Sequence, residues 1–442
     1  MSRWPAVGRI GCGRDIHWHE RACVTIPAAA YRLSLSPACR ISQREREATP
    51  PSLLSCSRGA GAVSRFPLPP ANGAAKPEES IDAEQPQARA MSDLSRRQFM
   101  QSQGAALAPA IASGAYVKPE HFTVDCQSHI FVPELIAYME KRKEPPYAYR
   151  RDGGTYVVVG EWHRRLRERH TDIEAKLADM DEAGISLTAL SINDPGPELF
   201  GADGPHVARM VNDYISELAT MHSDRLFGLI VLPLQDMDAA LRELDRCVTG
   251  KGMKGVLLYS NLDGSFPDED RYRPLFEHVQ RLDVPVLLHP AYPVTYDATV
   301  GRNLVAGLGL MFDTTIALAR LILSGILDEY PDLKLVCPHV GGTLPYLIGR
   351  LDHQTQVLKR GAENITKPPS EYLRNIYLDA VSPIPMAIQY GIDYVGAERM
   401  LYSSDHPWVD PKVIADCVRS LDLPDEDQAR IFGGNAKRLF RL

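Results

Sequence analysis

Short apolar runs and amphipathic stretches alternate along residues 122–442. The eight apolar runs are Phe122–Cys126, Leu187–Ile192, Phe227–Pro233, Gly255–Ser260, Val284–His289, Leu333–His339, Ile376–Ala380 and Met400–Asp405. Most of these runs are continuous rather than alternating, which is typical of strands buried on both faces of a parallel sheet. Eight alternations of strand and helix predict a (β/α)8 TIM barrel, rather than an open sheet, over residues 120–442.

The stretches between the runs have apolar residues every three or four positions, as helices do. The predicted helices are Ile173–Ala183, which follows Asp172 as an N-cap, then Val207–Met221, Ala239–Val248, Tyr272–Leu282, Thr314–Leu327, Leu344–Leu358, Pro385–Tyr390 and Pro411–Val418. An insertion, Glu144–His170, separates the first strand from the first helix. We expect it to form an excursion over the mouth of the barrel.

The first 90 residues lack this periodicity. They are rich in Pro, Ala, Arg and Ser, and hold 12 basic and 8 acidic residues, a net charge of +4. The remaining 37 basic and 48 acidic residues give −11, which accounts for the −7 of the whole chain. This composition predicts disorder for residues 1–90. If Met91 is the natural start, these residues are upstream sequence read in frame by mistake.

A different pattern begins at Met91. Residues 95–100 read Ser-Arg-Arg-Gln-Phe-Met, followed by the short apolar stretch Gly104–Ala112, which ends in a small-x-small triplet. This order predicts a twin-arginine export signal at residues 91–115, and hence a periplasmic or exported protein if the signal is used and a cytoplasmic one otherwise. The alternative is a basic extension with a chance Arg-Arg pair. The stretch is too short for a membrane span and contains Pro109.

Charge and cysteine usage exclude some functions. The acidic barrel segment has no basic run, so nucleic acid is not an expected partner. Its four cysteines, Cys126, Cys247, Cys337 and Cys417, lie far apart without a C-x-x-C spacing, which predicts free thiols rather than disulfides or a zinc knuckle.

Polar residues close the predicted strands. They are Asp125, Gln127 and His129 on the first strand, Asn193 and Asp194 on the second, Tyr259 and Asn261 on the fourth, His289 on the fifth, His339 on the sixth, Asp379 on the seventh and Asp405 on the eighth. The carboxyl ends of barrel strands meet around one pocket. Histidines and carboxylates that converge there are what a divalent metal needs, with a position left open for substrate or water.

Each of these residues also has a structural interpretation. A single histidine at a strand end is more often a hydrogen-bonded core residue, Asp405 could cap the next helix, and Asp379 could accept hydrogen bonds from loop amides. Their joint occurrence at several strand ends is what favours the metal site.

Four motifs resemble the amidohydrolase-related family of metal-dependent decarboxylases. They are Asp125–His129, His289–Pro290, His339–Pro345 and Ser404–Pro407, and the likeness covers residues 121–440. The resemblance implies a divalent metal, expected to be zinc with manganese as the alternative, held by Gln127, His129, His289 and Asp405. It implies that His339 and Asp405 are catalytic, and that Arg350 binds a substrate carboxylate, in some members across a dimer interface; a helix-surface ion pair is the alternative for Arg350. We predict that Asn193 and Tyr259 also contact the substrate, and the resemblance implies a homodimer.

The chain departs from the family pattern at two positions. The family has His-x-His or Glu-x-His at the end of the first strand, whereas this chain has Gln127–Ser128–His129. The amide oxygen of Gln127 is a weaker donor, so Gln127 is either a fourth ligand or a neighbour of a site with three ligands. In the semialdehyde decarboxylases of the family an arginine follows an aromatic residue in the insertion, and here Tyr156 is followed by Val157.

The resulting hypothesis is a non-oxidative carboxy-lyase that acts on a small aromatic or enol-like carboxylic acid. The metal would anchor the carboxylate and an adjacent oxygen, and protonation of the carboxylated carbon, by metal water or by Asp405 with help from His339, would release carbon dioxide. Tyr292, Phe312 and Trp408 would provide an apolar rim for a planar substrate. Two alternatives are a metal-dependent hydrolase of amide, lactone or C–C bonds and a barrel that binds a ligand without catalysis.

Overall fold

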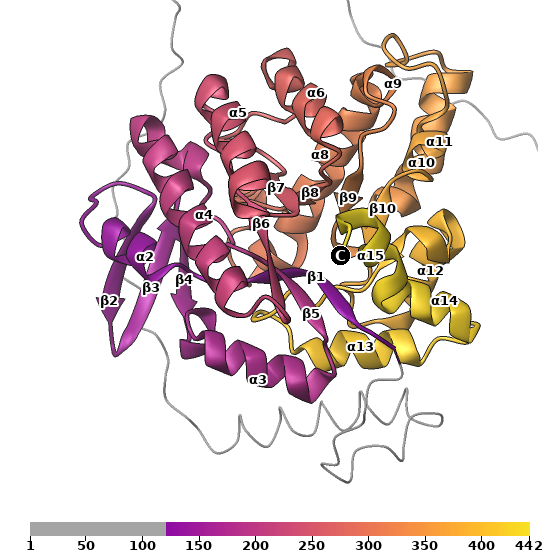
Figure 1. The fold of residues 1–442 in the computed structure, drawn as a ribbon. Coiled ribbons are helices and arrows are strands. Elements are labelled where there is room, and N and C mark those ends of the chain that lie inside the picture. The colour runs from indigo at the N-terminus through magenta and orange to yellow at the C-terminus, as the bar shows by residue number, and fades with distance from the viewer. Residues whose placement is uncertain (1–120) are drawn as a thin grey trace, which may run out of the picture. The chain divides into compact units, whose positions relative to one another are not determined.

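The computed structural model describes residues 121–442, and every structural statement below concerns that part of the chain (Figure 1). The segments predicted as disordered (1–90) and as an export signal (91–115) lie outside the described residues.

Eight parallel strands form one sheet in the order β1-β5-β6-β7-β8-β9-β10-β11. Their bounds are β1 Val124–His129, β5 Leu187–Ser191, β6 Leu226–Ile230, β7 Gly255–Tyr259, β8 Val286–His289, β9 Leu335–Cys337, β10 Tyr377–Asp379 and β11 Met400–Leu401. Each corresponds to one of the predicted apolar runs. The strands are buried almost throughout because helices cover the sheet, which explains why their sequences are continuously apolar.

Hydrogen bonds between the first and last strands close the sheet into a barrel. The amide of Cys126 donates to the carbonyl of Tyr402 (3.1 Å), the amide of Asp405 to that of Gln127 (3.0 Å), and the amide of His129 to that of His406 (2.7 Å). The predicted (β/α)8 fold is therefore confirmed. This seam matters for function, because it places residues from the two ends of the domain next to each other.

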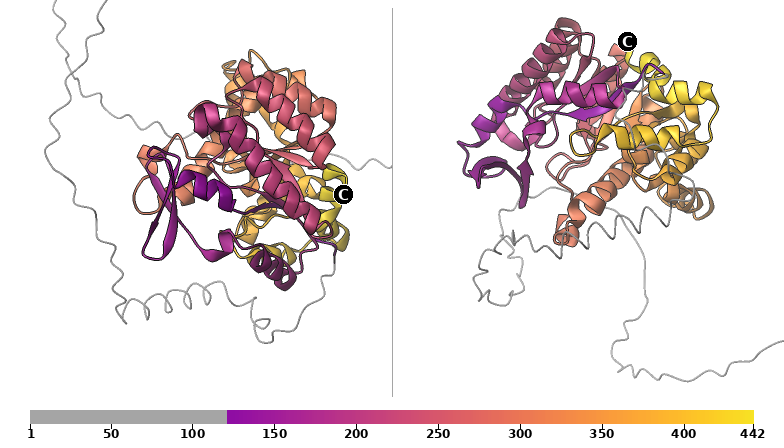
Figure 2. Two further views of the ribbon diagram at one scale, coloured as in Figure 1. Left: turned by 60° about the vertical axis from the view of Figure 1, so that its left-hand side comes forward. Right: turned by 90° about the horizontal axis from the view of Figure 1, so that it is seen from below.

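Helices surround the strands (Figures 1 and 2). The longer ones are α3 Ile173–Ala183, α4 Gly204–Met221, α5 Met237–Asp245, α6 Arg273–Leu282, α8 Leu310–Leu323, α10 Leu344–Asp352, α12 Pro385–Val395 and α13 Pro411–Arg419. Shorter ones are α2 Pro133–Met139, α7 Tyr296–Thr299, α9 Ile326–Glu329, α11 Pro369–Leu373, α14 Asp425–Ala429 and α15 Asn435–Phe440. Helix α3 has the predicted bounds, and the Asp172 side chain accepts hydrogen bonds from the amides of Glu174 and Ala175, as expected of an N-cap.

The insertion folds into a separate three-stranded antiparallel sheet, hereafter the hairpin sheet, of β2 Tyr147–Arg151, β3 Gly154–Val159 and β4 Trp162–Leu166. Its register places Val157 directly opposite Arg164. Directly opposed residues share a face of the sheet, and both of these side chains are buried. The other face carries the stacked rings of Tyr149 and Tyr156, with centroids 5.0 Å apart.

One helical stretch, Val305–Leu323, is long and apolar enough to cross a membrane by length and composition, and half of it is buried inside the protein. It consists of the π-helical turn η5 (Val305–Gly309) and α8, and its inner side chains, among them Leu318 and Ile322, belong to the core. The cysteines of the described part are free, as predicted, and three of the four are buried.

Candidate metal centre and cavity

Three of the four predicted metal ligands meet at the carboxyl end of the barrel. His129 ends β1, His289 ends β8 and Asp405 follows β11, and the ligand atoms of these three side chains all lie within 4.8 Å of one another. His129 and His289 are buried, and His289 and Asp405 face the cavity described below. Because the carboxyl ends of parallel barrel strands converge, residues far apart in the sequence share one site.

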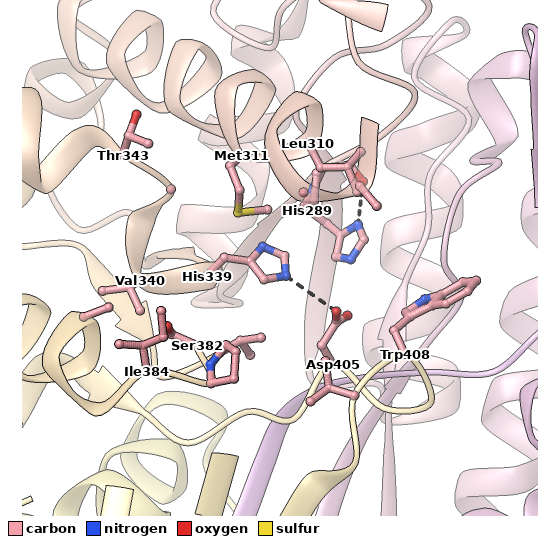
Figure 3. A pocket seen from close by; sticks show the side chains of 18 of the residues that line it. His289, Leu310, Met311, His339, Val340, Thr343, Ser382, Ile384, Asp405 and Trp408 are labelled. Carbon is pink, nitrogen blue, oxygen red and sulfur yellow. Dashed lines mark hydrogen bonds and ion pairs between the residues drawn. The ribbon is translucent and has the colours of Figure 1, made fainter. Parts of the chain in front are cut away.

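Hydrogen bonds fix the tautomer of both histidines. The Ser191 hydroxyl donates to the Ser128 carbonyl (3.2 Å), which leaves its oxygen to accept from Nδ1 of His129 (3.0 Å). Nδ1 of His289 donates to the carbonyl of Pro290 (2.7 Å) (Figure 3). Each imidazole therefore presents an unprotonated Nε2, and these two atoms face each other at 3.1 Å. Lone pairs directed at one another are unfavourable unless a cation lies between them, so this arrangement fits a divalent metal.

Gln127 lies beside these ligands. Its Nε2 donates to Oδ1 of Asp405 (3.2 Å) and lies 3.4 Å from Nε2 of His129. Its Oε1 is buried and has no hydrogen-bond partner among residues 121–442. Rotation of the amide by half a turn exchanges the two atoms and brings the oxygen towards the ligand set. The geometry therefore allows Gln127 to be a fourth ligand through its oxygen.

His339 stands on the other side of Asp405, with its Nε2 3.8 Å from Oδ2 of the carboxylate (Figure 3). Burial favours the neutral imidazole, but the Asp405 carboxylate outweighs burial and raises the pKa of His339. Burial alone would raise the pKa of Asp405, yet the neighbouring imidazoles of His129 and His339 hold that pKa well below its usual range. Burial, and then His129, lower the pKa of His289, so this imidazole stays neutral and able to ligate.

The backbone at two of these residues is in the left-handed region, with φ of 56° at His339 and 58° at Asp405. Residues other than glycine seldom adopt this conformation, and it concentrates at functional sites. Oδ1 of Asp379 accepts hydrogen bonds from the amides of His339 (2.7 Å) and Val381 (3.1 Å). Asp379 was expected either to belong to the site or to accept hydrogen bonds from loop amides, and the structure shows it accepting from the loop amides.

A large cavity opens beside the metal ligands. Its volume is about 880 Å³, and it is formed by the hairpin sheet, η5 and α8, α10, α12 and the loops after β8, β9, β10 and β11. The residues that Figure 3 labels in its wall include Leu310, Met311, Val340, Ile384 and Trp408, with His289, His339 and Asp405 as the polar group. A mostly apolar cavity with a few convergent polar groups suits a small, partly aromatic ligand.

The other predicted contact residues lie in different places. Asn193 lines the cavity. Tyr259 is buried behind the wall, with its hydroxyl 3.4 Å from the carbonyl of Asn193 and its ring against His289. Arg350 is exposed on α10 and is not among the residues that line this cavity. Of the expected rim, Trp408 lines the cavity, whereas Tyr292 and Phe312 do not.

Sequence reasoning missed two cavity residues, Trp162 and Arg164, which reach the wall from β4. Their position depends on the register of the hairpin sheet, which the short insertion did not reveal. The only available signal was the alternation of residues 162–166, where Arg164 falls on the same face as Leu166.

Sequence reasoning also missed a buried polar cluster behind the metal ligands. Nζ of Lys176 donates to the Ser128 hydroxyl (2.5 Å) and to Nδ1 of His406 (2.7 Å), and Nε2 of His406 donates to Asp179 (2.9 Å). The cluster ties α3 to both strands of the seam, next to His129 and Asp405. It therefore supports the positions of these two ligands.

Known proteins share this fold. The sequence profile of the amidohydrolase family matches residues 124–442. A gamma-resorcylate decarboxylase from Polaromonas sp. (strain JS666) is 33% identical over 308 residues, which cover 66% of this chain and 94% of that protein. The crystal structure of the dihydroxybenzoic acid decarboxylase from Polaromonas sp. JS666, with bound manganese and the inhibitor 2-nitroresorcinol, superposes with a TM-score of 0.63 and 28% identity over 73% of this chain and 97% of that one. The crystal structure of the IDCase from Metarhizium anisopliae superposes with a TM-score of 0.67 and 26% identity, over 72% of this chain and 97% of that one.

The fold and the ligand set thus define a metal-dependent barrel enzyme, and the chain belongs to the amidohydrolase family. Two of these relatives are named as decarboxylases, which confirms the prediction of an enzyme of the aromatic-acid decarboxylase type. The manganese in one of them supports a divalent metal as the cofactor.

Proposed function

We propose that the protein is a carboxy-lyase that removes carbon dioxide from a small aromatic carboxylic acid with an oxygen next to the carboxylate. The observation that supports this most is the pair of unprotonated Nε2 atoms of His129 and His289, which face each other beside Asp405 in an apolar cavity of about 880 Å³. A planar acid fits such a cavity, and the relatives named as decarboxylases act on acids of this kind.

His129, His289 and Asp405 would hold the divalent metal, with the amide oxygen of Gln127 as a fourth donor. When bound, the metal supplies a positive charge that anchors the carboxylate and its neighbouring oxygen. The sequence predicts zinc, and the manganese of the relative makes manganese the other ion to test.

The side chains at the cavity end handle the proton. His339 lies 3.8 Å from Asp405, and this carboxylate raises its pKa, so His339 is the side chain that holds a proton at the edge of the cavity. Transfer of this proton to the carbon that bears the carboxylate forms a C–H bond, and the electrons of the breaking C–C bond return to the ring as carbon dioxide leaves. Solvent then restores the proton. The apolar wall keeps water from the carbon during the transfer.

The direct test combines metal content with product analysis. Metal-loaded protein should contain close to one zinc or manganese ion per chain and should release carbon dioxide from a hydroxybenzoate, and His289→Ala should lose both the metal and the activity because it removes an enclosed ligand. His206→Ala is the matched control, since His206 is exposed on α4. Incorporation of water into the product without release of carbon dioxide would contradict the proposal in favour of a hydrolase. If the wild-type protein contains no metal and only the Gln127→His variant binds one, the result would favour a barrel that binds a ligand without catalysis.

We also propose a homodimer formed across the mouth of the cavity. Leu304, Leu308, Phe312 and Ile316 recur every fourth residue and are 36–43% exposed, so they form an apolar stripe along η5 and α8. Tyr346 on α10 and Met386 on α12, each 80% exposed, stand at the cavity mouth. A second copy would cover this surface, and the exposed Arg350 would then be available to the partner subunit's cavity.

The export signal expected at residues 91–115 remains our proposal for localisation. Folded, metal-loaded proteins are what the twin-arginine route transports, and a metalloenzyme suits such a route.

A further inference from the structure

One end of the cavity has a polar wall that the proposed chemistry does not use. Arg164 on β4 is the only lysine or arginine among the described residues that line the cavity, and its side chain is only 6% exposed. It lies over the ring of Trp162, with the guanidinium carbon 4.7 Å from the ring centroid. A buried arginine in the wall of a mostly apolar cavity needs partners, and it has them on one side only.

The guanidinium is held by the two residues that follow β5. Its Nη1 donates to Oδ1 of Asn193 (2.6 Å) and to Oδ1 of Asp194 (2.5 Å), and its Nη2 donates to the carbonyl of Asp194 (2.7 Å). These contacts use three of the five N–H groups that a guanidinium has. The Nε–H group and one Nη2–H group remain, and Nε is buried without an acceptor in residues 121–442.

The same contact orients Asn193. A guanidinium only donates hydrogen bonds, so the Asn193 atom that faces Arg164 has to be the amide oxygen. The NH2 group of Asn193 consequently points away from Arg164, and within residues 121–442 it makes no hydrogen bond. Because Asn193 lines the cavity, its NH2 group is available to a ligand there.

This polar wall carries no net charge. The Asp194 carboxylate neutralises Arg164 directly. Glu198, which lies near Asp194, adds no charge near neutral pH because burial raises its pKa to about 8. The wall therefore offers hydrogen-bond donors without the positive field that attracts a carboxylate. An uncharged oxygen, such as a ring hydroxyl, matches it better than a second carboxylate does.

We propose that Arg164 and Asn193 form a charge-neutral subsite that binds a ring hydroxyl of the substrate, with Asp194 as the positioning residue. The inference rests on the proposed function, since it names the substituent that an aromatic acid carries. It makes the substrate a hydroxylated aromatic monocarboxylic acid rather than an aromatic dicarboxylic acid.

The test compares substrates that differ by one group. Metal-loaded wild-type protein is given 2-hydroxybenzoate, the dihydroxybenzoates that add a second hydroxyl at each ring position, and 2-hydroxyisophthalate. Binding is measured by calorimetry and turnover by release of carbon dioxide. We expect at least one dihydroxybenzoate to bind roughly tenfold more tightly than 2-hydroxybenzoate, because one buried donor gains a partner, and the dicarboxylate to bind no better than 2-hydroxybenzoate.

The variants separate recognition from stability. Arg164→Met alone leaves Asp194 buried and unpaired, so Arg164→Met/Asp194→Asn, which removes both charges, is the main variant. It should raise the KM for the preferred dihydroxybenzoate roughly tenfold more than the KM for 2-hydroxybenzoate, which has no second hydroxyl to bind, and it should change the kcat for the dihydroxybenzoate much less than its KM. Arg165→Met, next to it on the exposed face of β4, is the control and should change neither.

Three results would overturn the inference. The first is that wild-type protein binds the dicarboxylate more tightly than the dihydroxybenzoates. The second is that Arg164→Met/Asp194→Asn raises the KM equally for acids with and without the second hydroxyl. The third is that this variant still binds the dihydroxybenzoate more tightly than 2-hydroxybenzoate. Wild-type protein that binds the dihydroxybenzoates selectively but releases no carbon dioxide would refute the proposed function and leave the subsite standing.

Discussion

Among single residues, Gln127 most distinguishes this metal centre. It places a neutral amide where the ligand set otherwise consists of two imidazoles and a carboxylate. An amide oxygen binds zinc more weakly than an imidazole nitrogen does, and it discriminates less against manganese. The identity of this one side chain therefore influences both the affinity and the choice of the ion.

Gln127→His should bind zinc about tenfold or more tightly than the wild-type protein, because an imidazole replaces an amide at the same position. Competition with a chromophoric chelator measures this without recourse to activity. Gln127→Met shows whether the amide oxygen is a ligand, since methionine keeps the size and removes the oxygen. An affinity that falls in Gln127→Met identifies a fourth ligand, and an unchanged affinity identifies a centre with three.

Glu198 should make stability depend on pH. Burial raises its pKa to about 8, so the native state keeps this proton over a range in which the unfolded chain, with a pKa near 4.5, has lost it. The native state then binds more protons, and the free energy of unfolding falls as the pH rises from about 4.5 to 8. Glu198→Gln should therefore be more stable than wild type at pH 8, by on the order of 2 kcal/mol, and by much less at pH 5.

Thermal unfolding at several pH values measures this difference. Glu217→Gln, an exposed change on α4, is the control and should show no such trend. A difference between Glu198→Gln and wild type that stays constant from pH 5 to pH 8 would show that Glu198 is ionised in the native state.

The histidines and the aspartate of the site that the sequence predicted share one property: each lies at or just after the end of an apolar run. His129, His289, His339 and Asp405 could be recognised for that reason, since strand ends converge in any barrel. The orientation of the His129 and His289 rings could not be predicted, because it depends on Ser191 and on the carbonyl of Pro290. The role of Asp379 stayed open for the same reason, since it depends on the fold of the loops whose two amides donate to its carboxylate.

At the scale of elements, the eight strands and the helices between them followed from periodicity, because burial on both faces of a parallel sheet leaves a strong pattern. The hairpin sheet could not be predicted in this way, because its register decides which side chains face the cavity. A slip of one residue in that register would turn Arg164 outwards. Helix α8 combines both cases. Its inner face was predictable, whereas the exposed stripe that it continues from Leu304 and Leu308 to Phe312 and Ile316 became apparent only from the folded surface.

Leu308→Glu/Ile316→Glu should convert the proposed dimer into a monomer, because two carboxylates would be buried without partners in the interface. Light scattering coupled to size-exclusion chromatography measures the mass. Met221→Glu changes an exposed apolar residue at the end of α4, away from the stripe, and should remain dimeric. Wild-type protein that is monomeric at micromolar concentration would contradict the proposal.

For the molecule as a whole, the described barrel and the export signal expected upstream combine into one prediction. In protein produced from Met91 in a bacterial host, Arg96→Lys/Arg97→Lys should shift the enzyme from the periplasmic to the cytoplasmic fraction, since the arginine pair is what the transport machinery recognises. Cell fractionation and immunodetection measure it. A host without the translocase gives the same cytoplasmic pattern for the wild type if the proposal holds, and a periplasmic wild type in that host would refute it.

The seam of the barrel has a consequence for how the protein is made. Gln127 and His129 come from the first strand and Asp405 from the end of the last, so the metal centre exists only when those strands have paired. A ribosome has to complete nearly the whole domain before any chain can load its ion, and a product that stops short of residue 405 stays empty however well its first strands fold. Metal content therefore reports the fraction of chains that were translated to the end and closed.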